Sequence, residues 1–120
     1  MGNRITYRDL EAWKKAMDFV EQVYRLSAQF PESERFGLSA QLRRSALSIP
    51  SNIAEGQARA TVADFKRMLY IARGSLAEAE TQLLIAVRLE YIGRNALKPV
   101  WRQAQTVGRL LNGLLRALKD

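Results

Sequence analysis

The feature that most constrains the fold of this chain is the recurrence of apolar residues at spacings of three and four in four successive segments. This period places apolar side chains on one face of a helix, and no stretch shows the period of two expected of a strand. The sequence therefore predicts an all-α fold with helices at about residues 9–30, 37–56, 61–92 and 95–118. Long helices joined by short connectors favour an antiparallel up-and-down four-helix bundle, a single domain over residues 1–120.

Several residues indicate where these helical segments begin, end or bend. Asp9, Thr61 and Asn95 are predicted to cap the first, third and fourth helices, and Gly93 to end the third. Pro50 falls inside the second helix, where its missing N–H removes a backbone hydrogen bond. A kink within a continuous second helix is the expected result.

The first segment is more apolar than one helix–helix contact requires. One apolar stripe holds Ala16, Phe19, Val23, Leu26 and Phe30. A second, adjoining stripe with the same period holds Leu10, Trp13, Met17, Val20 and Tyr24. This width suits a bundle rather than a two-stranded coiled coil, and it favours self-association. Among the other aromatics, Phe65 is predicted to lie in the core with Trp13, whereas Trp101 lies at the edge of an apolar arc.

The composition lacks two residue types that active sites and metal sites commonly use. The chain has no cysteine and no histidine, and so lacks thiolate ligands, the commonest general base and the commonest metal ligand. Three serines lie near Glu55, but no base or oxyanion site accompanies them, and they are predicted to serve packing and backbone hydrogen bonding around the kink: Ser45, Ser48 and Ser51. Glu78 and Glu80 are two positions apart and do not share a helix face. We therefore expect a non-enzymatic protein with no catalytic residue, metal site or cofactor.

The positive charge of the chain is concentrated at its end. The net charge is +7, and residues 91–120 contain six basic residues and one acidic residue. Four of these cations, together with Gln105 and Asn112, fall within about 80° of arc on the fourth helix. The four cations are called the basic row here: Lys98, Arg102, Arg109 and Arg116. Arg94 and Lys119 extend the set of candidate nucleic-acid-binding residues at the two ends of the segment.

A row of like charges without interleaved acids favours a polyanionic partner, RNA or DNA above all. One alternative is that carboxylates such as Glu55, Glu78 or Glu80, or those of another subunit, pair with the row, as in a protein–protein assembly module. A second is that the row is an idle solvated surface. Peripheral membrane binding through the fourth helix is the least favoured, because its leucine-rich face would have to leave the bundle. No segment is long enough to span a bilayer, and we expect a cytoplasmic location.

Four runs of residues carry a resemblance to a known family: Asp9-Leu-Glu-Ala-Trp13, Arg35-Phe-Gly-Leu38, Ile49-Pro-Ser-Asn-Ile-Ala-Glu-Gly56, and Tyr70-Ile-Ala-Arg-Gly-Ser-Leu76 with the Glu78, Glu80, Thr81 and Leu83 that follow. In order and spacing, from Asp9 to Leu118, the chain closely resembles the four-helix bundle proteins encoded in 23S ribosomal RNA intervening sequences. Glu90 stands where many members have glycine, and Ala79 where a larger apolar residue is common; both departures are expected to alter local packing.

The resemblance implies an up-and-down bundle assembled into a ring of five subunits. It also implies kinship with the basic accessory protein of diversity-generating retroelements, which acts with a reverse transcriptase and nucleic acid. It does not imply an established activity. Together with the basic row, it predicts an oligomeric, nucleic-acid-associated protein, a basic scaffold or an RNA chaperone, whose other partner is itself as a homopentamer or a second protein.

Overall fold

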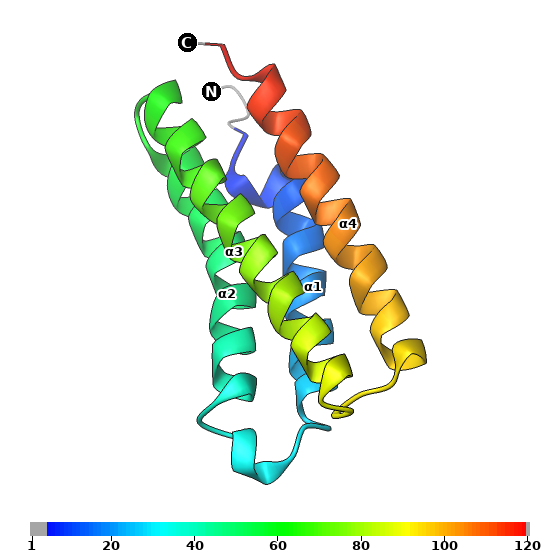
Figure 1. Ribbon diagram of the computed structural model, residues 1–120. Helices are drawn as coiled ribbons and strands as arrows, with labels where there is room; N and C mark the ends of the chain where they lie inside the picture. The colour runs from blue at the N-terminus through cyan, green and yellow to red at the C-terminus, as the bar shows by residue number, and fades with distance from the viewer. Residues whose placement is uncertain (1–4, 120) are drawn as a thin grey trace.

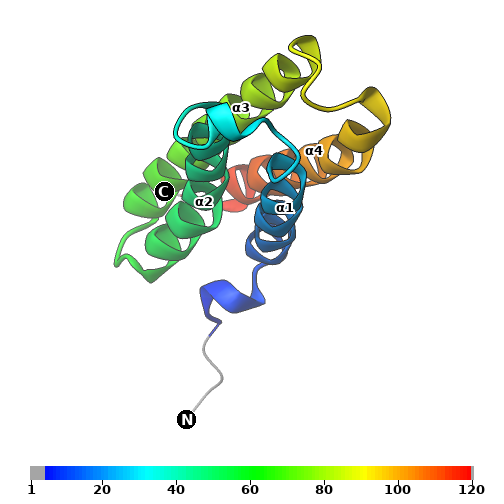
Figure 2. The same cartoon turned by 90° about the horizontal axis from the view of Figure 1, so that it is seen from below.

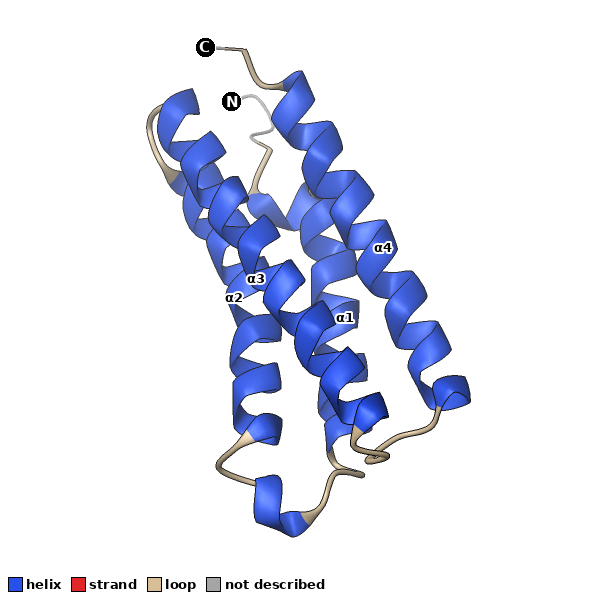
Figure 3. Ribbon diagram, in the orientation of Figure 1, coloured by secondary structure: helices blue, strands red, loops and turns tan. Residues whose placement is uncertain are grey.

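The computed structural model describes residues 5–119, which form four α-helices and no strand (Figure 1, Figure 3). The helices are α1 (Glu11–Ser27), α2 (Leu38–Ala58), α3 (Val62–Arg88) and α4 (Arg94–Ala117). Two short 3-10 helices, η1 (Tyr7–Asp9) and η2 (Glu32–Glu34), precede α1 and α2. The predicted all-α class with four helices is confirmed.

The helices run up and down around a common core. Each contacts the next along the chain, and α4 returns to pack against α1 (Figure 2). The bundle measures 51 × 25 × 25 Å, and α2 and α3 form its closest pair. The surface between α3 and α4 is therefore formed by consecutive helices, on the opposite side of the bundle from the surface between α1 and α2.

The core is made by the stripes that the sequence pattern predicts. On α1 and α4 the buried apolar residues follow spacings of three and four: Ala12, Ala16, Phe19, Val23, Leu26, Val100, Ala104, Val107, Leu111 and Leu115. Each fully buried large side chain contributes about 1.5–3 kcal/mol of transfer free energy. Trp13 and Phe65, which were predicted to lie in the core, are half-buried and pack against it.

A polar contact joins α2 to α3 beside the proline. The hydroxyls of Ser48 and Ser75 lie 2.8 Å apart, and the Asn52 amide donates to the Ser48 carbonyl at 2.7 Å. Helix α2 continues without interruption through Pro50, and the kink there stays a prediction. The Ser48 hydroxyl thus serves helix packing.

The helix ends differ from the predicted positions at several places. Thr61 caps α3 as predicted, accepting the Asp64 N–H at 3.1 Å. Asp9, however, lies in η1, and Leu10 precedes α1. Gly93 is the N-cap of α4, one position before its first residue Arg94, so Asn95 lies inside that helix.

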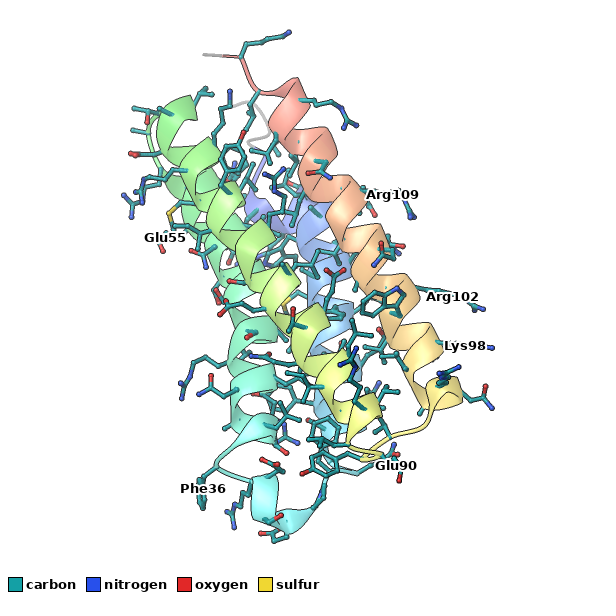
Figure 4. All side chains as sticks on the ribbon, in the orientation of Figure 1. Phe36, Glu55, Glu90, Lys98, Arg102 and Arg109 are labelled. Carbon is teal, nitrogen blue, oxygen red and sulfur yellow. The ribbon has the colours of Figure 1, made fainter. Side chains whose placement is uncertain are left out.

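The third helix ends at Arg88, four residues earlier than predicted, because the chain folds back on its last turn. The Tyr91 N–H donates to the Ala86 carbonyl at 2.9 Å, and the Glu90 N–H donates to the Val87 carbonyl at 3.0 Å. These two bonds form a Schellman motif, which requires a left-handed residue after the helix. Glu90 occupies that position with a φ of 62°, at the bend before α4 (Figure 4).

Replacing Glu90 with glycine should therefore stabilise the protein. A left-handed conformation costs a residue with a Cβ about 1 kcal/mol relative to glycine. We expect Glu90→Gly to raise the melting temperature by about 4 °C in thermal unfolding followed by circular dichroism. Glu78→Gly, the same change at an exposed position inside α3, should lower it by a similar amount. Equal effects of the two changes would contradict this account of the turn.

The Glu34 carboxylate bonds to the start of α2 and to Tyr91 at the same end of the bundle. The Leu38 N–H donates to Glu34 Oε1 at 2.9 Å, and the Tyr91 hydroxyl donates to Oε2 at 2.7 Å. The backbone bond, then the tyrosine bond, lowers the pKa of Glu34. The folded state thus favours the ionised carboxylate of Glu34. This contact stabilises the fold at pH values above the ordinary carboxyl pKa, and the stabilisation is lost as the pH falls through the lowered pKa of Glu34.

Candidate nucleic-acid interface

The basic row lies on the solvent side of α4 along most of its length. All four of its cations are exposed, and Lys98, Arg102 and Arg109 project away from the bundle along one edge (Figure 4). From Lys98 to Arg116 the row spans about 27 Å at 1.5 Å per residue. It faces outward because the opposite side of α4 is buried in the core.

The two outer candidates also lie at the surface. Arg94 is the first residue of α4, and Lys119 follows the helix; both are exposed. The structure therefore places all six predicted residues on or beside one helix. The two polar members of the same arc, Gln105 and Asn112, are instead engaged with α3.

Carboxylates of the described residues do not pair with the basic row. Within residues 5–119, none of its four cations forms an ion pair with an acidic side chain. Glu55 pairs with Arg59 on the opposite side of the bundle (Figure 4). Glu80 accepts a hydrogen bond at 3.0 Å from the Gln105 amide, and Glu78 is exposed without an ion pair to the row. The alternative in which Glu55, Glu78 or Glu80 pairs with the row is therefore not seen among residues 5–119 of one subunit.

Glu80 of α3 bonds to Gln105 of α4 and not to an arginine of the basic row among the described residues. Burial raises the pKa of Glu80, and the hydrogen bond from Gln105 offsets part of this. A neutral amide, rather than a guanidinium, thus satisfies the carboxylate. Arg109 in turn donates to the Thr106 hydroxyl of its own helix at 3.2 Å. The charges of the row stay available to an external anion.

A groove of about 830 Å³ opens between the end of α3 and the start of α4. Its apolar wall includes Leu84 and Ile85, which are 46% and 40% exposed, and the half-buried Trp101. Four cations also line it: Arg88, Arg94, Lys98 and Arg102. Trp101, which the sequence pattern places at the edge of an apolar arc, therefore lies on the wall of a groove that is also lined by cations.

A second aromatic and two more arginines lie farther along the same pair of helices. The Arg73 guanidinium stacks 4.9 Å from the centre of the Tyr70 ring and donates to Asn112 Oδ1 at 3.0 Å. With Arg116, these residues line a hollow of about 360 Å³. Tyr70, Arg73 and Arg88 were not predicted from the sequence as site residues, because they belong to α3. Only the register between the two helices brings them beside the row.

The membrane alternative finds no support in α4. Its leucine-rich side contributes buried residues such as Leu111 and Leu115 to the core. Exposing them to a bilayer would require the bundle to open. In the part of the chain that the structure describes, no helix is both long enough and apolar enough to span a membrane.

Comparisons with known proteins agree with this architecture. A protein of unknown function from Bacteroides thetaiotaomicron VPI-5482, assigned to the S23 ribosomal protein family, has a similar crystal structure, with a TM-score of 0.81 and 28% sequence identity. The match covers 88% of this chain and 99% of that one. Comparison with curated proteins gives no match. The family model described as 23S rRNA-intervening sequence protein matches residues 8–113, so the chain belongs to this family.

Proposed function

We propose that the protein is a non-enzymatic, oligomeric nucleic-acid-binding protein that acts as a basic scaffold or RNA chaperone. The observation that carries this proposal is the basic row, which is exposed, extended and without carboxylate partners in the described chain. Like charges held together on one helix edge repel one another, and a chain of phosphates relieves that repulsion while releasing its own counterions. Because the row offers charge to phosphates, we expect it to bind nucleic acids with little preference for base sequence.

The linear shape of the row favours a polyanionic chain over a small anion. Arg102, Arg109 and Arg116 follow one another every seven residues, about 10.5 Å apart along α4. A single phosphate reaches one or two of these guanidinium groups, whereas consecutive phosphates of a strand can pair with all of them. Binding of this kind depends strongly on salt and weakly on base sequence.

The test is a fluorescence anisotropy titration of unrelated RNA oligonucleotides of about 12 nucleotides at low salt. We expect similar affinities for all of them, and much weaker binding of a peptide nucleic acid that carries the same bases without phosphates. Absence of binding to RNA, or equal binding of the uncharged analogue, would refute the proposal.

Self-association is the second part of the proposal, and the surface between α1 and α2 supports it. The second apolar stripe of α1 is only partly covered there, leaving Met17 40% and Tyr24 38% exposed. On α2, which packs against α1, Leu47 is 44% exposed. We take these exposed side chains of the two adjoining helices as a candidate apolar patch, because apolar patches at a protein surface often mark contacts between subunits. Neighbouring subunits of a closed ring bury such a patch against a different surface of the next copy.

Light scattering should accordingly give a mass several times 13.6 kDa, and five times this value for the ring that the family resemblance implies. Leu47→Glu places a charge on the patch and should lower the measured mass, because burying an unpaired charge is costly. Gln41→Glu introduces the same charge at an exposed position of the same helix and should leave the mass unchanged. A monomeric wild-type protein at micromolar concentration would overturn this part of the proposal.

A further inference from the structure

Trp101 has a half-buried ring whose N–H edge contacts no partner among residues 5–119. Within residues 5–119 its indole makes no ring stacking contact and its N–H donates no hydrogen bond, although it lies on the groove wall. The other tryptophan, Trp13, packs edge-on against Tyr7 at 5.3 Å. The indole N–H of Trp101 is not among the buried unpaired polar atoms of the described residues, so it stays open to solvent. The ring of Trp101 is therefore positioned for a ligand or for solvent, rather than for the core.

The charge around this ring is of one sign. Four cations line the groove, two from the loop-proximal turns of α3 and α4 and two from the basic row: Arg88, Arg94, Lys98 and Arg102. No carboxylate is among the lining residues. The groove therefore suits a ligand that is apolar and flat at its centre and anionic on its flanks.

We propose that the groove holds an unpaired base of a single-stranded nucleic acid, stacked on the Trp101 indole, with the neighbouring phosphates paired to the surrounding cations. This inference rests on the nucleic-acid binding proposed above and specifies its substrate. Stacking between a base and an aromatic side chain is tolerant of sequence because every base has a π-face. In a duplex the base faces are covered by their neighbours, so the groove selects single strands.

The surface beyond the groove favours a strand over a lipid or another small amphiphile. Tyr70, which is 51% exposed, offers a second ring beside Arg73 and Arg116. The hollow at Tyr70 includes Leu115, about 21 Å from Trp101 along α4. An anionic lipid in the groove would leave the distant arginines without a ligand. A strand that runs along α4 uses both rings and the cations between them.

Replacing Trp101 provides the first test. Trp101→Ala should weaken binding of a single-stranded oligouridylate of about 12 nucleotides by about ten- to a hundredfold, while Trp101→Phe should restore most of the affinity. Inorganic polyphosphate, which has charge but no bases, should bind wild type and Trp101→Ala equally. An RNA duplex of the same length should also be insensitive to the substitution, and the salt dependence of the remaining binding should be unchanged.

Fluorescence gives an independent readout of stacking. Trp13→Phe leaves Trp101 as the single tryptophan, and its emission should be quenched on addition of the single strand but not of polyphosphate. Salt-dependent binding without quenching, and without loss in Trp101→Ala, would overturn the stacking proposal and leave the general nucleic-acid proposal standing. A lower mass of Trp101→Ala in light scattering would assign the groove to a second copy. A blue shift with anionic vesicles and none with RNA would assign it to lipid. Each of these outcomes refutes the inference.

Discussion

Gly56→Ala is expected to lower the free energy of unfolding by about 1–2 kcal/mol, despite the higher helix propensity of alanine. Gly56 is buried in the last turns of α2, where α3 begins to pack against it. An added Cβ would lie 2.8 Å from the Cβ of Met68 and 3.3 Å from the carbonyl oxygen of Phe65. These atoms belong to the backbone of α3 or are fixed to it, so they cannot rotate away. The two helices would have to separate at their closest approach.

Gly74→Ala is the matched control. It lies inside α3 with no atom within 4 Å of an added Cβ, so the change should stabilise by about 0.5–1 kcal/mol. Urea denaturation measures both, with midpoints shifted in opposite directions and an unchanged slope. If Gly56→Ala were as stable as Gly74→Ala, the close packing of α2 on α3 would be wrong.

The largest functional effect is expected from replacing Arg102, Arg109 and Arg116 together with glutamine. Each phosphate contact on a single strand contributes about 0.7 to the salt exponent, so losing three weakens binding by about a hundredfold at 0.1 M salt. Folding and mass should be unchanged, because none of the three pairs with a carboxylate in residues 5–119. The measurement is an anisotropy titration of wild type and variant with the same RNA.

The control for this triple variant removes the same charge from other helices. Arg25, Arg44 and Arg67 are exposed on α1, α2 and α3, and exposed ion pairs such as Arg25 with Glu21 contribute little to stability. Their replacement with glutamine should affect RNA binding far less. If the row instead serves a subunit interface, the α4 variant would dissociate, because each lost arginine leaves a partner carboxylate unpaired. Dissociation would therefore favour the assembly-module alternative.

The fold follows from the sequence because its determinants are local. The spacing of Phe19, Val23 and Leu26 on α1 identifies a buried face without knowledge of any partner helix. The end of α3 could not be placed in the same way. In the sequence Gly93 has the form of a helix stop, whereas the residue in the left-handed conformation is Glu90. The turn at Glu90 is held by the next residue, Tyr91, which packs on Phe30 and donates a hydrogen bond to Glu34. Such tertiary contacts override local preference.

The candidate site was predicted in part, for a similar reason. The basic row lies on one helix, so its angular pattern is visible in the sequence, whereas the exposure of all four residues comes from the structure. The groove needs Arg88, Leu84 and Ile85 from α3, which meet Trp101 through the register of two helices. That register is set by the α3–α4 packing and its turn, which the apolar period alone does not specify. The groove could therefore be found only from the structure.

The proposed function requires that the basic row on α4 binds the phosphates of nucleic acid. This is tested by the slope of log affinity against log salt concentration for a single-stranded RNA, measured for wild type and for the variant lacking Arg102, Arg109 and Arg116. We expect the variant's slope to be shallower by about 2, since three phosphates at about 0.7 each are no longer neutralised. Identical slopes, with both proteins folded and of equal mass, would contradict it.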